Sequence, residues 1–318
     1  MGDRERGAAM VMVLMLVAVL SLLAVHLNEL MRFGVQRIVN RTQSEQAYWY
    51  AQGGEVLARL KLQAALEQSP AAVERLLQGS ALRYPIDGGN VKVSLSGVQS
   101  CFNLTSLSYA QSPSLSLQRW RALGEVLALD ALRFERFTDQ LQDWLDTDSR
   151  PRQHGGESPM YLMRAFPHFS QDTPLMWLAE AAPIWPLFAD TGWQALKRLL
   201  CVRAGDGRLV LNPNDLQERH AALVSAFLLN RLSPEQVKVA LALKTGNGYA
   251  HLDQFFTSPM GKALSLQEGE KGVFSLERRD FTVLVEVSYR KASYVFHTAL
   301  QWQGNTLTKR FSQAGYIP

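Results

Sequence analysis

The sequence lacks the residue patterns of the common catalytic sites. None of its six histidines stands in an H-x-x-x-H or H-E-x-x-H pattern, and it has no G-x-S-x-G, P-loop or G-x-G-x-x-G motif. Asp and Glu are plentiful, but any pair of them can be ordinary surface charge. Because no nucleophile or general base can be nominated, we predict that the chain is not an enzyme and requires no cofactor for catalysis.

A dense cluster of one charge is also missing. The chain carries 33 Lys and Arg against 29 Asp and Glu, a net charge of +4. The stretch Lys271 to Pro318 holds seven basic residues against three acidic ones and so accounts for an excess of four. Nucleic-acid binding requires a concentrated basic patch, so we interpret this stretch as a solvated face and expect no nucleic-acid partner.

Proline is absent from the first 69 residues. This part opens with an apolar run, Ala8 to Val25, of 18 residues without charge, proline or glycine, which is the threshold length for crossing a bilayer. The run continues past Ser21 without an A-x-A site, which argues against a cleaved secretory signal. Apolar residues then follow helical spacing at Leu27, Leu30, Met31, Val35, Ile38 and Val39. We predict one helix over about 8–66. The simplest interpretation of this helix is an ordinary signal-anchor with a helical stalk, and it is kept as the alternative to the interpretation given below.

Three compositional zones follow this helix. Residues 83–100 alternate apolar and polar side chains, which predicts strand, and residues 103–260 are rich in Ala, Leu and helix starts. Strand patterns return over 272–312, with turns at Arg290-Lys291 and Gly304-Asn305. The fold class is therefore α+β: a helix with an antiparallel sheet, interrupted by a large α-helical insertion. The similar stretches "FNLTSL" and "LVLNPNDL" suggest two related helical subdomains, at about 105–198 and 212–260, unless common turn residues coincide.

Five ordered motifs resemble one protein family. The leader and anchor "RERGAAMVMVLMLVAVL", the helix stretch "AYWYAQGGEVLARL", and the segments "CFNLTSL", "DWLDTDSRPRQHGGES" and "LNPNDL" are similar to those of the general secretion pathway protein K family, minor pseudopilins of type II secretion. Two positions depart from the family motifs: Thr105 replaces the second Asn of F-N-L-N-S-L, and Asp215 replaces the Thr of N-x-N-T-L. The motifs together span most of the chain.

The resemblance implies a domain plan. Residues 1–7 form a prepilin leader, 8–25 the transmembrane part of the helix, 26–102 and 262–318 a pilin-like periplasmic domain, and 103–261 an inserted helical domain of two SAM-like, helix-hairpin-helix-like subdomains. It further implies a single-pass protein of the inner membrane with its C-terminal domain in the periplasm. The expected partners are the I- and J-type minor pseudopilins, the major pseudopilin and the prepilin peptidase.

The resemblance also assigns the start of the mature chain. A prepilin peptidase would cut between Gly7 and Ala8, so that Ala8 becomes the first mature, methylated residue and Met12 the fifth. Most pilins carry a glutamate at that fifth position, and the K proteins are the branch that lacks it. The implied function is a subunit at the tip of the periplasmic pseudopilus that nucleates its assembly for export of folded proteins across the outer membrane.

The acidic segment after residue 142 is a candidate calcium site. With Asp146 as loop position one, Asp148 is position three and Glu157 position twelve, as in an EF-hand, but Pro151 stands where an EF-hand needs glycine. An irregular calcium loop with Asp143, Asp146, Asp148 and Glu157 as ligands is still compatible with the pattern, because clustered carboxylates repel one another unless a cation joins them. The family resemblance supports this hypothesis. A solvated acidic turn neutralised by arginines is the alternative.

The chain has only two cysteines, Cys101 and Cys201. In the periplasm such a pair tends to oxidise, and the bond would close a loop of about 100 residues, which is worth about 4–5 kcal/mol on the entropic model. Two buried, reduced thiols are the alternative.

One stretch keeps a second function open. "LSPEQVKVALALKTGNGYAHLDQF" resembles a helix-hairpin-helix, with a glycine turn at 245–248, and this fold often grips the DNA backbone. Lys244 is the only positive charge near that turn, whereas phosphate contacts need several cations or exposed backbone N–H groups. A membrane-anchored DNA-binding protein is therefore the alternative function, and protein contacts are the preferred use of this unit.

Overall fold

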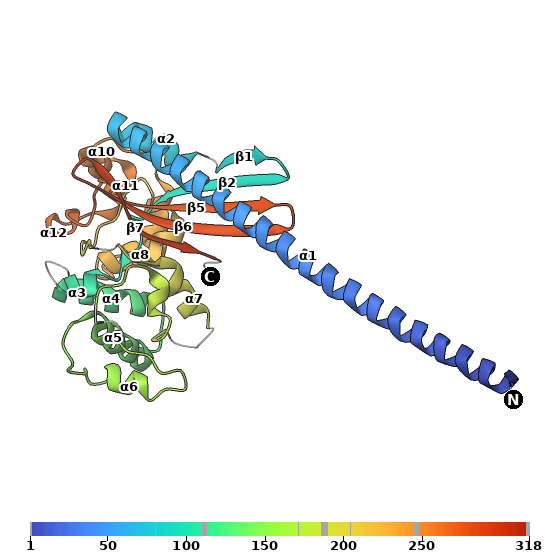
Figure 1. Ribbon diagram of the computed structural model, residues 1–318. Helices are drawn as coiled ribbons and strands as arrows, with labels where there is room; N and C mark the ends of the chain where they lie inside the picture. The colour runs from blue at the N-terminus through green and yellow to red at the C-terminus, as the bar shows by residue number, and fades with distance from the viewer. Residues whose placement is uncertain are drawn as a thin grey trace.

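In the computed structural model, one helix dominates the N-terminal part of the chain. The structure describes residues 2–79, 81–109, 113–170, 172–185, 190–203, 205–244 and 248–315, and for residues 2–9, 11, 108, 109 and 113 only the backbone. Helix α1 (Gly2–Gln68) runs unbroken for 67 residues, and its first half projects away from the remaining elements (Figure 1). Among the described residues, one helix is long and apolar enough to cross a membrane, judged by length and composition alone.

Helix α1 ends at Gln68, just before the N-cap and first proline of the next helix. Ser69 takes an extended conformation and its side chain accepts a hydrogen bond from the backbone N–H of Ala72, which caps the short helix α2 (Pro70–Gln78). Pro70 stands at the first position of α2, where its missing N–H is harmless, and it disfavours a helical Ser69. The predicted end near residue 66 is therefore correct to within two residues.

The long helix packs on one face of a five-stranded antiparallel sheet. The strands are β1 (Leu82–Ile86), β2 (Gly89–Gly97), β5 (Asp280–Tyr289), β6 (Ala292–Gln303) and β7 (Thr306–Ala314), in that spatial order. Alternate side chains of β2 and β5, such as Val93 and Val285, are buried against α1. Gly54 of α1 permits this close contact, because a Cβ there would lie 2.9 Å from Val285 Cγ1.

The first strand region differs from its prediction. Residues 83–100 were expected to form strand throughout, whereas the structure shows a hairpin of β1 and β2. Its turn is Asp87-Gly88, where Gly88 has a φ of +80° that glycine adopts without strain. The predicted turns at Arg290-Lys291 and Gly304-Asn305 both join strands as expected.

The helical insertion lies between two strands that are neighbours in the sheet. Gly97 at the end of β2 pairs with Phe281 at the start of β5, so the chain leaves the sheet before the insertion and returns to it afterwards at nearly the same place. The inserted elements are β3 (Phe102–Asn103), α3 (Ser106–Tyr109), α4 (Pro113–Val126), α5 (Ala131–Leu145), α6 (Ser158–Leu162), η1 (Leu178–Ala181), α7 (Thr191–Leu199), β4 (Leu200–Cys201), η2 (Glu218–His220), α8 (Ala221–Phe227), α9 (Pro234–Ala242), α10 (Leu252–Thr257), α11 (Pro259–Leu264) and α12 (Glu268–Lys271).

Two hydrophobic cores show where the insertion ends. One core lies between α1 and the sheet, and the other runs from Phe102 to Phe274 within the insertion. The predicted boundary at residue 261 is too early, because α11 crosses it and its Leu264 belongs to the helical core. The two predicted subdomains share this single core, and Arg119 of α4 donates from Nε to the carbonyl of Phe227 in α8 at 3.1 Å.

Candidate functional site

Where α1 packs on the sheet, its opposite side is not covered by other elements and carries exposed apolar residues. Trp49, Val56 and Leu60 are 66%, 42% and 58% exposed, although the opposite side of the same helix turns is buried on the sheet. A Cβ on Gly53 would meet no atom within 4 Å. These four positions follow the i, i+4, i+7, i+11 spacing of one helix face, so the helix presents an apolar stripe with a gap at the glycine.

The predicted processing site lies at the beginning of this helix. Gly7 and Ala8 belong to the backbone of α1, and Met12 follows with 72% of its surface exposed. Met1, the first residue of the predicted leader, lies outside the described residues.

Three of the four predicted calcium ligands come together. One carboxylate oxygen each from Asp146, Asp148 and Glu157 lies within 4.8 Å of the others. Asp146 is the residue that follows α5, and Glu157 is the residue before α6. The connecting segment therefore folds back so that the end of one helix meets the beginning of the next.

Asp143, the fourth predicted ligand, is not among the three carboxylates that lie within 4.8 Å of one another. It is fully buried, and both its oxygens accept hydrogen bonds from Arg152, from the backbone N–H at 3.0 Å and from the guanidinium. Gly155 is necessary here, because a Cβ at that position would lie 1.8 Å from Asp143 Oδ2. Asp143 thus holds the loop in shape, and Arg152 also bonds Asp146 at 2.6 Å.

The cluster is electrostatically strained when no cation is present. Burial raises the pKa of Glu157 to about 7, and the charges of Asp143, Asp146, Asp172 and Asp148 add to the shift. Burial likewise raises the pKa of Asp146, against the opposing effect of Arg152. One oxygen each of Asp146, Glu157 and Asp172 is buried without a hydrogen-bond partner in the part of the chain that the structure describes. Hard oxygen donors in this state fit a calcium ion.

Asp172 is a candidate ligand that sequence reasoning missed. It lies 15 residues after Glu157 and outside the acidic motif, so no local spacing points to it. In the structure its charge acts on Glu157. Two residues before it, the hydroxyl of Ser170 shares a hydrogen bond of 2.7 Å with that of Ser158 at the beginning of α6. The φ of Asp172, +50°, is uncommon for a residue other than glycine.

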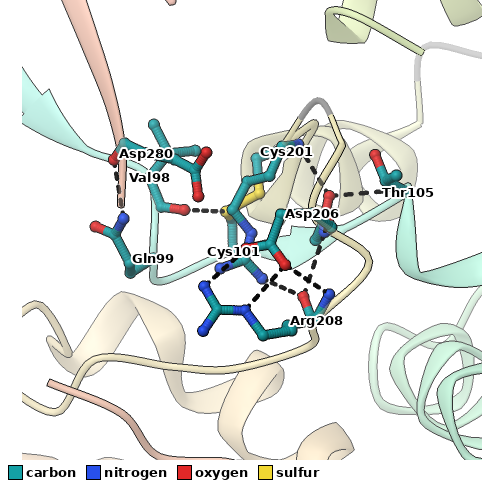
Figure 2. The surroundings of a disulfide bond; sticks show 10 residues. Val98, Gln99, Cys101, Thr105, Cys201, Asp206, Arg208 and Asp280 are labelled. Atoms are coloured by element: carbon teal, nitrogen blue, oxygen red, sulfur yellow. Dashed lines mark hydrogen bonds and ion pairs between the residues drawn. A yellow bond between two sulfur atoms is a disulfide. The ribbon is translucent and has the colours of Figure 1, made fainter. Parts of the chain in front are cut away.

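The two cysteines are joined. Cys101 and Cys201 form a disulfide with a Cα–Cα distance of 5.7 Å (Figure 2). Beside it, β3 and β4 pair in parallel, and the buried Asn103 donates to the carbonyl of Asp206 and accepts from the backbone N–H of Arg203 at 3.0 Å. The Asn of the "CFNLTSL" motif therefore fastens the beginning of the insertion to the segment that follows α7.

The "LNPNDL" motif connects the insertion to α2 through the side chain of Arg278. Arg278, whose side chain is 7% exposed, donates to Glu74 of α2 at 2.7 Å and to Asp215 at 2.6 Å. Asp215 is the residue that departs from the family motif, so this ion pair depends on the substitution. Asn214 accepts from the backbone N–H of Tyr249 at 2.7 Å and thereby holds the chain that follows the predicted glycine turn.

In the possible DNA-binding hairpin, the lysine before the predicted turn is engaged within the protein. Lys244 donates to the backbone carbonyls of Asn214 and Leu216, and burial lowers its pKa. Of the predicted turn at 245–248, residues 245–247 lie outside the described residues. The one cation that sequence reasoning nominated is thus engaged within the protein, and the DNA-binding alternative is not supported.

Comparison with known proteins gives consistent results. A family model described as type II secretion system (T2SS), protein K matches residues 100–205. The chain is similar to the type II secretion system protein K of Klebsiella pneumoniae, at 27% identity over 96% of this chain and 95% of that protein, and to that of Pectobacterium carotovorum subsp. carotovorum, at 27% over 80% and 79%. Among solved structures, a chain of the GspK-GspI-GspJ complex from enterotoxigenic Escherichia coli matches with a TM-score of 0.72 and 22% identity, covering 88% of this chain and 100% of that one. The predicted α+β fold with its N-terminal helix is confirmed.

Proposed function

This chain belongs to the type II secretion system protein K family, and we propose that it acts as a minor pseudopilin at the tip of the periplasmic pseudopilus. There it nucleates assembly of the filament that exports folded proteins across the outer membrane. The protein works by assembly and has no catalysis of its own. The observation that carries the proposal is α1, which continues from an apolar, membrane-length run into a helix that packs on the sheet and leaves its outer stripe uncovered.

The stripe of α1 is the proposed contact with other pseudopilins. Trp49, Val56 and Leu60 supply apolar area, and the bare Gly53 allows a second helix to approach closely. The related complex contains GspK together with GspI and GspJ. We extend this to the present chain, with I- and J-type minor pseudopilins as direct partners and the major pseudopilin as the next subunit in the filament.

The proposed maturation places the chain in the inner membrane. The prepilin peptidase cuts between Gly7 and Ala8, the new N-terminus is methylated, and the apolar helix spans the bilayer with the C-terminal domain in the periplasm. Met12 then occupies mature position five. A carboxylate at bilayer depth is costly unless it is paired, and Met12 avoids that cost. A subunit without that carboxylate needs no amine from a neighbour, which suits the end of a filament.

We also propose calcium as a structural ion of the insertion. Asp146, Asp148 and Glu157 would hold it, with Asp172 as the further carboxylate, while Asp143 and Arg152 shape the loop. The ion supplies positive charge to carboxylates that are buried and mutually repelling.

Co-purification with the partners tests the proposed function. We expect the full chain, extracted in detergent, to bind the I- and J-type pseudopilins, and the Trp49→Ser/Val56→Ser variant to bind them about tenfold more weakly, as for loss of an interface hot spot. Val239→Ser, at an exposed position of α9, is the matched control. Equal binding by the α1 variant and the wild type would remove the stripe from the interface, and a failure of the wild type to bind either protein would refute the assembly role.

A further inference from the structure

The disulfide forms part of the wall of a cavity. This cavity, of about 610 Å³, lies between α2, the end of β2 and the segment that precedes α8, and both Cys101 and Cys201 line it. Leu77, Gly97 and the exposed Arg219 form other parts of the wall. Each cysteine keeps 9% of its surface exposed. A disulfide sealed in the interior is reached only when the protein opens, whereas this one is reached through the cavity.

Contacts other than the bond itself also hold the two cysteines side by side. In the parallel pair of β3 and β4, Asn103 lies opposite Cys201, and the backbone N–H of Leu104 donates to the carbonyl of Cys201 at 2.9 Å. The buried Asn103, two residues after Cys101, accepts a hydrogen bond from the backbone N–H of Arg203 at 3.0 Å. Because folding brings the two thiols together, the bond can open and close while the chain stays folded.

The charges of the cavity permit the entry of a thiolate. Glu74 and Asp215 are the carboxylates that line it, and Arg278 bonds both of them, at 2.7 and 2.6 Å. Arg219 adds a further positive charge to the same wall. The two negative charges are thus compensated, so the cavity does not repel the anion that attacks a disulfide.

We propose that Cys101–Cys201 is a redox-active disulfide that exchanges, in the folded protein, with an external dithiol–disulfide couple through this cavity. A thiolate of the dithiol attacks one Sγ, the S–S bond breaks, and the other cysteine leaves as a thiolate that takes a proton from water. The second thiol of the dithiol loses its proton and attacks the mixed disulfide, which releases the first cysteine. Two electrons and, by way of water, two protons pass to the protein, and the dithiol becomes a disulfide. The reverse sequence closes the bond after the chain has folded.

Reduction of the full chain in detergent tests the exchange. If the bond were reached only by global unfolding, the native state would react about 10³-fold or more slowly than the chain in urea, as set by the folding equilibrium constant. We expect dithiothreitol to reduce the native chain at a rate within about 100-fold of that in urea, with the freed thiols alkylated and counted by mass spectrometry. The reduced chain should keep its native circular dichroism. A native rate below that range, or unfolding on reduction, would overturn the proposal.

A variant that narrows the cavity tests the route. Gln217 is exposed and lines the cavity, whereas its neighbour Glu218 is exposed and does not line it. We expect Gln217→Trp to slow native reduction by about tenfold and to leave the rate in urea unchanged, and the control Glu218→Trp to change neither. Equal native rates in the two variants would overturn the route through the cavity.

A second probe distinguishes the sources of the dithiol. Thioredoxin carries its dithiol on a protein, so reduction by thioredoxin as well as by dithiothreitol assigns a protein couple, and reduction by dithiothreitol alone assigns a small-molecule couple. Co-purification with the pseudopilins is measured on the oxidised chain, so this proposal and the assembly role fail separately.

Discussion

Replacing Glu157 by glutamine tests the carboxylate cluster most directly. Folding raises the pKa of Glu157 from 4.5 to about 7 when no cation is bound. Because the native state then holds this proton more tightly than the unfolded chain, the stabilising contribution is full below about pH 4.5 and is lost as the pH rises through 7. The difference corresponds to roughly 2–3 kcal/mol near pH 7.5. Glutamine keeps the size of the side chain and carries no charge, so it should be more stable than wild type by about that amount in chelator.

Calcium should act in the opposite sense. The cation favours the ionised carboxylate, and at a hundredfold excess over Kd it should stabilise the wild type by about 2.7 kcal/mol. The Glu157→Gln variant loses a charged ligand, so most of this gain should disappear. Thermal unfolding of residues 28–318, which contain both hydrophobic cores, measures these differences as shifts of about 2–4 °C per kcal/mol.

Two comparisons make the result decisive. Glu268→Gln removes a carboxylate whose side chain is 88% exposed and should change neither the pH dependence nor the response to calcium. The difference between wild type and Glu157→Gln in chelator should vanish below about pH 4.5. A wild type that is equally stable with chelator and with millimolar calcium, together with a glutamine variant that gains no stability at pH 7.5, would refute both the strained cluster and the cation site.

The other predictions concern maturation and the closure of the insertion. Mass spectrometry should find Ala8 as the first mature residue, and Gly7→Val should leave the precursor uncut; an intact N-terminus in the wild type would contradict the pilin assignment. Met12→Glu should be tolerated poorly or have little effect in a secretion assay, and improved secretion would contradict the tip position. Cys101→Ser/Cys201→Ser should lower the free energy of unfolding by about 4–5 kcal/mol, since the disulfide closes a loop of 100 residues; a loss below about 1 kcal/mol in denaturant melts would contradict a constraint on the unfolded chain.

The main elements of the fold follow from periodicity in the sequence. Helix α1 could be predicted because no proline interrupts it and its apolar residues keep helical spacing over many turns. The C-terminal strands could be predicted because each alternates and each pair is joined by a recognisable turn. The end of the insertion could not, because α11 and α12 have six and four residues, too few to establish a period. The assignment of α11 to the insertion depends on the tertiary burial of Met260 and Leu264.

The candidate metal site shows the same limit at the level of side chains. Spacing identified Asp146, Asp148 and Glu157 as acidic residues of one loop, and the structure brings these three together. Spacing alone could not separate these three residues from Asp143. The oxygens of Asp143 accept hydrogen bonds from Arg152, in a geometry that depends on Gly155. Spacing could not identify Asp172, because it lies outside the acidic motif and its charge acts on Glu157 only in the folded chain.

The contacts between the two cores determine whether the insertion can move independently of the sheet. An insertion joined by two strand ends could pivot, but here both connections are tied to the sheet. The backbone N–H of Val98 and the side chain of Gln99 both donate to the carbonyl of Asp280, at 3.0 and 2.9 Å. Arg278 adds ion pairs to α2 and to the insertion, and Trp177 stacks on Phe311 of β7 with ring centroids 5.1 Å apart. Since these contacts add to the two chain connections, the insertion should move with the sheet as one body. Movement of α1 would then displace the whole insertion, including surfaces that the helix itself does not touch.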